Sequence, residues 1–327
     1  MAMADVRLTL TMDCERVRES EFYPAGPVSW EESARNIAAF AAIVEEYGCR
    51  ATFFAVPEAV EAHVELFKRL IAAGHEVGLH LHPHTFRYGV NEYLGNLPYD
   101  RQFDIVREAR DAFAAALGFP PTSFRPGHFS ANADTFRILS SLGFLRGSSV
   151  IPGRHLTGTG GDWRNWPRRC QYVGSVFEVP VTVQHVHGGR FVAHAARHAL
   201  RLASHGFVFD AVRNFVLAVS GGTNGSTKAA RLVDLRIESG SYGLTRAVID
   251  AEVTGIRASG LAGMLTAVTH SYVNYAAQDR GTREHGMSRR SHLRRMLADL
   301  KRRSDVVVTS RTLSELQRDF DAGAVTA

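Results

Sequence analysis

The feature that most constrains the fold is an alternation of short apolar segments with longer helical segments. The apolar runs 6–12 (VRLTLTM) and 50–56 (RATFFAV) each precede a helical stretch, and these two helices stop at Gly48 and Gly74. The alternation continues with a helix near 99–117, a strand near 122–126 and a helix at 132–142. Strands separated by helices of this length predict βαβ units, and therefore a parallel sheet with right-handed crossovers.

The second half of the chain continues this pattern after an interruption. Residues 177–183 form the next expected strand, and residues 184–240 contain five histidines and the flexible segment 220–226 (SGGTNGS). The elements expected beyond them are a helix near 243–259, a strand at 264–269, a helix near 289–302, a strand at 306–308 and a last helix from about 312. We therefore expect one α/β domain over 1–327, with an insertion at 184–240 over the carboxyl ends of the strands.

Composition excludes several classes of protein. The chain has 45% hydrophobic and 22% charged residues, which is ordinary for a folded globular protein and excludes a disordered chain or a fibre. Its three cysteines form no CxxC pair, which argues against a disulfide framework or a cysteine zinc finger. The N-terminus meets acidic residues before a long apolar run, and no 18-residue apolar span occurs, so the expected location is the cytoplasm.

The net charge of +5 comes from one segment. Residues 276–304 contain nine lysines and arginines against three acidic residues, so the rest of the chain has a balance of −1. No nucleic-acid-binding motif accompanies this segment, and we expect no nucleic-acid partner. The basic segment is expected to be a solvated helix face, with peripheral contact to an anionic surface or substrate as the functional alternative.

Two carboxylates follow the first strand. Asp13 and Glu15, in TMDCE, have the same parity along an extended chain, so their side chains point the same way. Cys14 has the opposite parity, together with Leu10 and Met12. Two solvated charges in a turn are the alternative interpretation of this segment.

Histidines follow the apolar run 77–79, in GHEVGLHLHPH. In an extended chain His80 and His84 would lie roughly 13 Å apart at ~3.3 Å per residue, too far to share a metal ion. A helical turn would bring the pair onto one face, at the i, i+4 spacing of metal-binding histidines, and His82 would then face elsewhere. This spacing, beside a strand-end carboxylate, predicts metal binding.

Two further strand ends carry polar groups. Arg125 and His128, in FRPGHF, stand at the end of the strand near 122–126, where an arginine can orient a carboxylate through a bidentate contact. His270, in LTAVTHSY, stands where a late strand ends. An ordinary surface arginine and a noncatalytic histidine are the alternatives at these positions.

These four motifs, in this order over about 6–320, resemble the polysaccharide deacetylase family, which is also known as carbohydrate esterase family 4 or the NodB homology domain. The resemblance implies a distorted (β/α) barrel, commonly with seven strands. It also implies metal-dependent hydrolysis of an acetyl group, expected here to be an N-acetyl group on a sugar or sugar conjugate. Members usually carry two adjacent aspartates in the first motif, whereas Cys14 occupies the second position here.

The resemblance also implies roles for individual residues. Asp13 is the expected general base, His270 the general acid that protonates the leaving amine, and Arg125 the group that orients Asp13. The expected metal ligands are Glu15, His80 and His84, with Cys14 as the alternative to Glu15. His128, Asp162 and Trp163 are expected at the substrate, with Asp162 orienting the acid histidine and Trp163 lining the acetyl pocket. A surface loop is the alternative interpretation of residues 161–163.

The resemblance leaves the metal and the substrate open. The expected cofactor is a divalent ion, with zinc first and Co, Ni, Mn and Fe as alternatives. The expected partner is an N-acetylated saccharide or glycoconjugate. Fold does not fix function. An amidohydrolase that acts on a non-sugar C–N bond and a catalytically silent sugar-binding barrel are therefore the competing hypotheses.

Overall fold

The structure is a computed structural model that describes residues 3–18, 26–84, 86–186, 231–238, 242–277 and 288–325. The chain divides into two compact units, one of residues 1–183 and 234–327 and the other of residues 184–233. Most of the insertion expected at 184–240 lies outside the described residues. In the remaining part, β10 (Val183–Val186) and β11 (Arg231–Asp234) form a two-stranded sheet.

The first unit is built on a curled sheet of nine strands, in the order β12-β1-β2-β3-β4-β5-β9-β8, with β13 also paired to β1. All pairs are parallel except β8–β9, which confirms the expected parallel α/β architecture. Seven strands were expected, and the additional ones include the antiparallel edge. The strands are β1 (Ala4–Cys14), β2 (Ala51–Ala55), β3 (Glu76–Leu81), β4 (Ser123–Pro126), β5 (Arg146–Gly147), β8 (Gln171–Val173), β9 (Val176–Glu178), β12 (Gly263–His270) and β13 (Val306–Ser310).

Strand β1 is the centre of this sheet. It pairs with β12 along one edge, while β13 and β2 share its other edge. Every residue from Val6 to Cys14 is buried, because helices and neighbouring strands cover both faces, as in other parallel sheets. In the register with β12, Asp13 stands directly beside His270. The strand therefore places Asp13, which is still buried, at the rim of the sheet.

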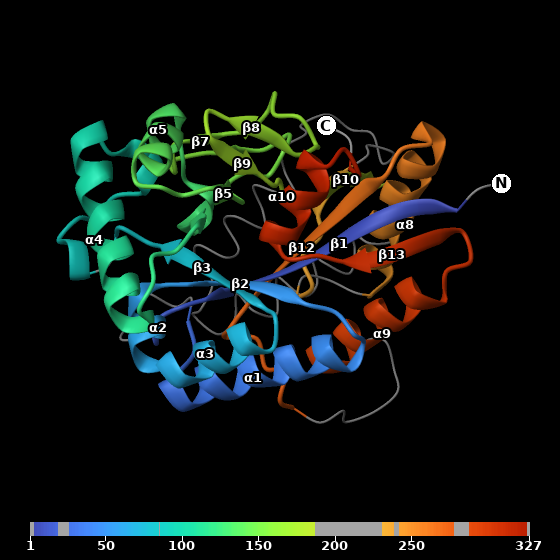
Figure 1. The fold of residues 1–327 in the computed structure, drawn as a ribbon, viewed down its shortest axis with the longest axis horizontal. Coiled ribbons are helices and arrows are strands. Elements are labelled where there is room, and N and C mark those ends of the chain that lie inside the picture. The colour runs from blue at the N-terminus through green and yellow to red at the C-terminus, as the bar shows by residue number, and fades with distance from the viewer. Residues whose placement is uncertain are drawn as a thin grey trace, which may run out of the picture. The chain divides into compact units, whose positions relative to one another are not determined.

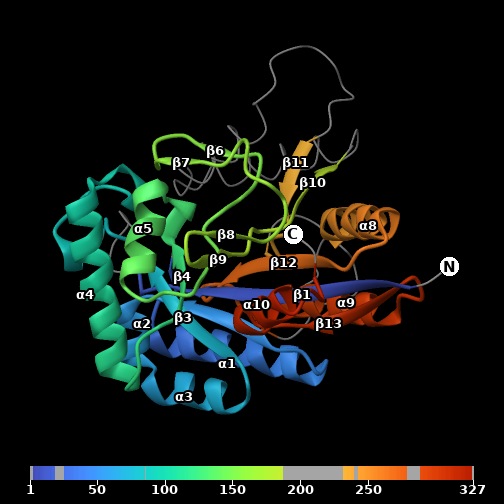
Figure 2. The same ribbon diagram turned by 45° about the horizontal axis from the view of Figure 1, so that its top comes forward.

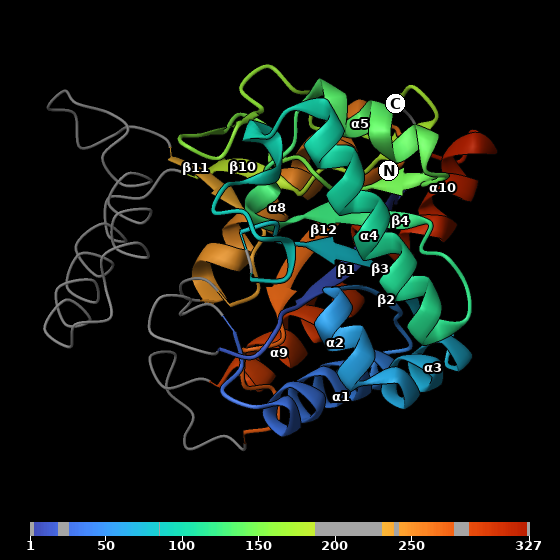
Figure 3. The same ribbon diagram turned by 90° about the vertical axis from the view of Figure 1, so that its left-hand side faces the viewer.

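Helices pack around the sheet, and neighbouring helices contact one another in the order α8, α9, α1, α3, α2, α4, α5 (Figures 1 and 2). In Figure 3 the helices α1, α2 and α3 lie together below the strands β1, β2 and β3. The helices are α1 (Trp30–Glu46), α2 (Pro57–Ala62), α3 (Val64–Ala72), α4 (Tyr99–Leu117), α5 (Ala133–Ser141), α8 (Tyr242–Ser259), α9 (Arg289–Arg302) and α10 (Leu313–Asp321).

Local sequence signals explain most helix boundaries. Ser29 caps α1 by accepting a hydrogen bond from the Glu32 backbone N–H, and Gly118 ends α4 in the left-handed conformation at φ 87°. The single helix expected over 57–73 is instead two helices, α2 and α3, because His63 leaves the helical conformation at φ −128°. In the part of the chain that the structure describes, no helix has the length and apolarity needed to span a membrane.

Several basic side chains of helix α9 have partners, on other elements or on the helix itself. Arg294 pairs with Glu46, Arg302 pairs with Asp299, and Arg295 lies 4.3 Å from the centre of the Tyr242 ring. Just beyond the helix, Arg303 pairs with Asp250 and Asp305. Contact with an anionic surface through residues 276–304 stays a prediction, since 278–287 lie outside the described residues.

Candidate active site

The carboxyl ends of β1, β3, β4 and β12 meet at one rim of the sheet, as expected for parallel strands. These four ends bring together Asp13 and Glu15, His80 and His82, Arg125, and His270. All six side chains are at most 12% exposed. Charged groups are rarely buried without partners, and the partners here divide the rim into two adjoining clusters.

The first cluster is built on Asp13. Its Oδ1 accepts a hydrogen bond from Nη1 of Arg125 at 2.7 Å, and the Arg125 side chain is fully buried. Arg125 is held in place by donating to the backbone oxygen of Ser148 at 3.0 Å and to its hydroxyl at 2.8 Å. Burial alone would raise the pKa of Asp13, but Arg125, His80 and His270 outweigh it and lower that pKa. Asp13 is therefore held ionised, as a proton acceptor must be.

His270 lies on the other side of Asp13. Its Nε2 is 3.8 Å from Oδ2 of Asp13, and its Nδ1 is 2.5 Å from Oε1 of Glu238. The ring also stacks on Tyr272, with the ring centres 4.8 Å apart. A carboxylate that accepts from Nδ1 fixes the ring orientation and leaves Nε2 facing Asp13. Asp13 and His270 thus form a carboxylate–imidazole pair in which each member has its own support.

The position that orients His270 was assigned to Asp162, and the structure gives it to Glu238. Asp162, in the hairpin of β6 (His155–Leu156) and β7 (Gly161–Asp162), is 46% exposed and pairs with Arg164 at 2.8 Å and with His155 at 3.8 Å. The assignment was wrong because it relied on a motif position, whereas the contact to His270 is made through the three-dimensional fold.

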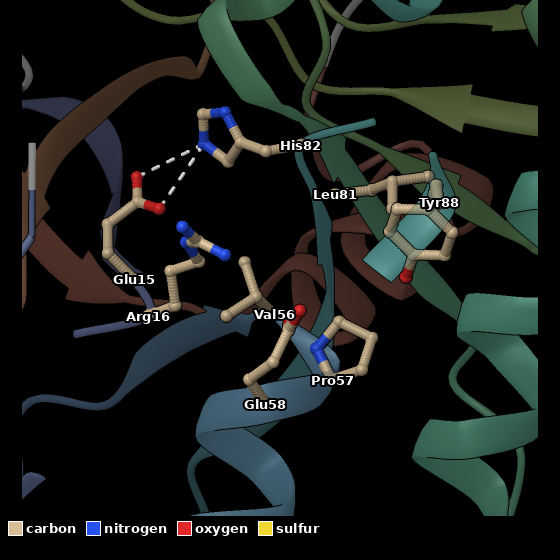
Figure 4. Close-up of a pocket in the computed structure, with 8 residues that line it drawn as sticks. All are labelled: Glu15, Arg16, Val56, Pro57, Glu58, Leu81, His82 and Tyr88. Carbon is tan, nitrogen blue, oxygen red and sulfur yellow. Dashed lines mark hydrogen bonds and ion pairs between the residues drawn. The ribbon is translucent and has the colours of Figure 1, made fainter. Parts of the chain in front are cut away.

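The second cluster consists of Glu15, His80 and His82. The Nε2 atoms of His80 and His82 lie 3.4 Å and 3.3 Å from the Glu15 carboxylate and 3.1 Å from each other. Figure 4 shows Glu15 and His82 facing each other, with dashed lines from one ring nitrogen to both carboxylate oxygens. The side chains of the histidines hold the pKa of Glu15 well below its usual value despite its burial. Three potential ligand atoms therefore converge on one small volume.

His82 was expected to face away from this cluster, and that expectation is wrong. Strand β3 extends to Leu81 and a turn follows at Pro83 and His84, so the helical turn expected between His80 and His84 does not form. In an extended segment His80 and His82 share a parity, which brings both rings toward Glu15. His84 instead packs against His82, with ring centres 5.2 Å apart.

Among the described residues, two groups of three side chains place their ligand atoms within 4.8 Å of one another. One is Glu15, His80 and His82, and the other is His82, His84 and His128. The predicted ligand set of Glu15, His80 and His84 thus spans both groups. Glu15 and His80 lie together as predicted, and His82 takes the place next to them.

The first group has the chemistry of a site for a divalent metal ion. His80 Nδ1 donates to the backbone oxygen of Arg125 at 2.8 Å, which directs the lone pair of Nε2 toward Glu15 and His82. Within the described part of the chain, Oε2 of Glu15 accepts no hydrogen bond, although it is buried. A buried carboxylate oxygen and imidazole nitrogens that face one another suit a cation better than they suit each other.

Cys14, the alternative ligand, points elsewhere. Its side chain is fully buried, and its Sγ lies 3.9 Å from the backbone oxygen of Met12. Burial, followed by the charges of Asp13 and Glu15, raises the pKa of its thiol well above the usual value. Metal ligation needs the thiolate, so the structure favours Glu15.

The remaining predicted residues lie near the second group or behind it. His128 contacts the rings of His82, His84 and Tyr93, and it adopts the left-handed conformation at φ 54°. Trp163 is 3% exposed, donates its indole N–H to the backbone oxygen of Phe129, and packs in a hydrophobic cluster with Phe136. Trp163 thus supports the turn that carries His128.

Two functional candidates were missed in the sequence. His82 was set aside because a helical turn was expected, although its parity with His80 was a usable signal. Glu238 lies 32 residues before His270 and belongs to no motif. The pairing of its segment with β12 brings it to His270, and no local sequence pattern signals that contact.

Comparison with known proteins agrees with this geometry. Residues 25–146 match the family model described as polysaccharide deacetylase, a range that includes His80, His82, Arg125 and His128. These residues belong to the polysaccharide deacetylase family. The family segment ends before β12, so Glu238 and His270 lie outside the match, as do Asp13 and Glu15. A comparison with curated proteins gives no match.

Solved structures extend the likeness from residues 25–146 to the whole fold. A protein described as a polysaccharide deacetylase from Mycobacterium smegmatis is 16% identical, with 99% of this chain and 97% of that chain covered and a TM-score of 0.55. One from Pseudomonas aeruginosa PAO1 is 13% identical, with 99% and 93% covered and a TM-score of 0.55. Puue allantoinase is 15% identical, with 99% and 92% covered and a TM-score of 0.52. At these identities the likeness establishes the deacetylase (β/α) barrel fold.

Proposed function

We propose that this protein is a metal-dependent hydrolase that removes an acetyl group, preferentially an N-acetyl group, from a sugar or sugar conjugate. The observation that carries the proposal is that the two neighbouring carboxylates, Asp13 and Glu15, have different partners. Asp13 contacts Arg125 and His270, whereas Glu15 contacts His80 and His82. An acid–base pair thus adjoins a separate set of metal-ligating side chains.

Glu15, His80 and His82 would hold the ion, with His84 as the alternative third ligand that the sequence spacing favours. A divalent ion bound there would supply Lewis-acid polarisation of the acetyl carbonyl and a lowered pKa for water. Zinc is the first candidate, because two imidazoles and a carboxylate are a common zinc donor set; Co, Ni, Mn and Fe are the alternatives.

The chain's own residues account for the proton transfers. Asp13, held ionised by Arg125, accepts a proton from the attacking water. His270 donates a proton from Nε2 to the leaving amine nitrogen and becomes neutral, while Glu238 accepts a hydrogen bond from Nδ1 and holds the ring in place. Arg125 orients Asp13 and keeps it ionised until it accepts that proton. Loss of either proton carrier is expected to lower kcat by about 10²–10⁴-fold.

The decisive experiment measures acetate release from a panel of N-acetylated sugars and sugar conjugates, together with metal content by mass spectrometry. Asp13→Asn is expected to retain metal and lose activity, whereas His80→Ala is expected to lose both. A protein that purifies without metal, gains none on incubation with Zn²⁺ and releases no acetate would contradict the proposal.

The third ligand is resolved by a matched pair of variants, His82→Ala and His84→Ala. If His82 completes the site, His82→Ala loses bound metal and His84→Ala keeps it. The reverse result would assign the role to His84 and would mean that the loop after β3 rearranges when metal binds.

An amidohydrolase for a non-sugar C–N bond is the second candidate. The likeness in fold to an allantoinase favours keeping it, because one barrel supports different substrates. Ring opening of a cyclic ureide or amide, or amine release from an open-chain amide, without acetate release from any acetylated sugar, would identify this activity.

A further inference from the structure

A segment that follows β11 brings three charged residues to the acid histidine. Residues 234–238 run parallel to β12: Ile237 N–H donates to Val268 O at 3.0 Å, and Val268 N–H donates to Leu235 O at 3.0 Å. Leu235 and Ile237 are buried, at 1% and 0% exposed. By strand alternation Asp234, Arg236 and Glu238 share the other face. Backbone pairing therefore fixes the spacing of these three charges.

The three residues form a chain of alternating charge. Arg236 Nε lies 2.9 Å from Oδ2 of Asp234, and Arg236 Nη1 lies 3.7 Å from Oε1 of Glu238. Asp234 is anchored in turn by Arg154 at 3.0 Å. The same Oε1 of Glu238 contacts Nδ1 of His270 at 2.5 Å. Arg236 is thus held on one side by Asp234 and presents its charge to the carboxylate that orients His270.

His270 lies between two carboxylates, Glu238 at Nδ1 and Asp13 at Nε2. Two uncompensated anions would hold a proton on the imidazole and make it a poor donor. Each carboxylate has its own guanidinium, however, because Arg125 pairs with Asp13 and Arg236 faces Glu238. Among the described residues, Tyr272 also packs on the ring. The charge of each carboxylate beside His270 is therefore offset by an arginine.

We propose that Arg236 is a positioning residue that keeps Glu238 on Nδ1 of His270 and offsets its charge, so that His270 can release its proton to the leaving group. This inference rests on the proposed function and extends it to a residue that touches no reacting atom. The lowered pKa of Glu238, to which His270 and Arg236 contribute against burial, agrees with it.

The test compares Arg236→Gln with the matched control Arg311→Gln. Arg311 is 25% exposed and pairs with Asp319 at 2.8 Å away from the site, while Arg236 is 26% exposed and pairs with Asp234 at 2.9 Å. Arg236→Gln is expected to lower kcat about tenfold with unchanged KM and metal content, and to move the basic limb of the pH–rate profile up by about half a unit or more. Arg236→Lys should restore most of the activity. Arg311→Gln should leave both kcat and the basic limb of the pH–rate profile unchanged.

A double variant decides whether Arg236 acts through Glu238. In the background of Glu238→Gln, adding Arg236→Gln should cause no further shift of the limb. An unshifted profile in Arg236→Gln, or a shift that persists in the double variant, overturns the inference.

Failure of the proposed function is distinguishable from failure of this inference. If the wild type releases no acetate, the proposed function fails, and the His270 ring is followed by NMR instead. Its titration should move to higher pH in Arg236→Gln but not in Arg311→Gln, and equal titration in both variants would overturn the role of Arg236.

Discussion

Gly127 lies so close to His82 that a Cβ added to it would fall 2.3 Å from Nδ1 of the imidazole ring. The glycine at this position in FRPGHF therefore provides the space in which the His82 ring stands. Gly127 follows β4 directly, and β4 pairs with β3, the strand that precedes His82. The end of β4 therefore determines where the His82 ring can lie.

Gly127→Ala is expected to displace the His82 ring, because the added methyl group would occupy the space of the imidazole. Metal binding should weaken about 10–100-fold, as it does when a residue that supports a ligand is changed. Competition with a chelator measures the affinity. Gly255→Ala in α8 is the control, because a Cβ there meets open space and alanine favours helix. Unchanged affinity in Gly127→Ala would show that His82 is not held in place by this contact.

Removing the charge of Arg125 should affect both stability and catalysis. Arg125→Gln leaves Asp13 buried without its cation, and we expect a loss of about 3–5 kcal/mol in the free energy of unfolding. Because Arg125 lowers the pKa of Asp13, that pKa should rise and the acid limb of the pH–rate profile should move to higher pH. Denaturant titration and a pH–rate profile check the two effects. An acid limb at its original pH would remove Asp13 from the role of base.

The choice between Glu15 and Cys14 has a direct readout in metal content. Glu15→Gln should lose bound metal, because the amide replaces the anionic ligand that faces His80 and His82. Cys14→Ala should keep metal at wild-type stoichiometry, since the thiol points to the Met12 carbonyl. Loss of metal in Cys14→Ala with full metal in Glu15→Gln would reverse the assignment.

Glu178 should make stability depend on pH. Burial raises the pKa of its fully buried carboxyl to about 8, from a usual value of 4.5. Between these values the folded state holds a proton that the unfolded state has released, so stability falls as pH rises from about 4.5 to 8, by up to about 1.4 kcal/mol per pH unit. Glu178→Gln should remove this slope, and exposed Glu65→Gln should keep it, in denaturant titrations across this range. Equal slopes in all three proteins would mean that Glu178 is ionised in the fold.

The C-terminal helix offers a test of local stability. Thr312 caps α10 by accepting a hydrogen bond from the Glu315 backbone N–H, and Glu315 reciprocates at the cap. Thr312→Ala should cost about 1 kcal/mol in thermal or denaturant unfolding. Thr254→Ala, which removes an exposed hydroxyl in the middle of α8, should be neutral or slightly stabilising.

Sequence patterns predicted elements whose boundaries have local causes. The helix expected at 99–117 is α4, because Gly118 supplies the left-handed residue that ends it, and the helix expected at 289–302 is α9. Features that depend on distant partners were not predicted. The break at His63, the turn after β3 and the contact of Glu238 with His270 follow from packing and strand register, which no local pattern encodes.

The site shows the same division. Asp13, Glu15, His80, Arg125 and His270 were found because strand ends of a parallel sheet converge, and the structure brings these five side chains to one rim. Asp162 was assigned from a motif position and pairs with Arg164 instead of His270. His84 was assigned from its i, i+4 spacing with His80, and the structure groups it with His82 and His128.

Register pairing of Asp13 with His270 has a practical consequence for protein engineering. The two proposed proton carriers lie on adjacent paired strands, so the backbone pairing of β1 with β12 sets their spacing. Loops that contact the substrate can then be exchanged while the proton-transfer pair stays aligned. A library confined to the hairpin of β6 and β7, residues 155–162, would leave the sequences of β1 and β12 unchanged.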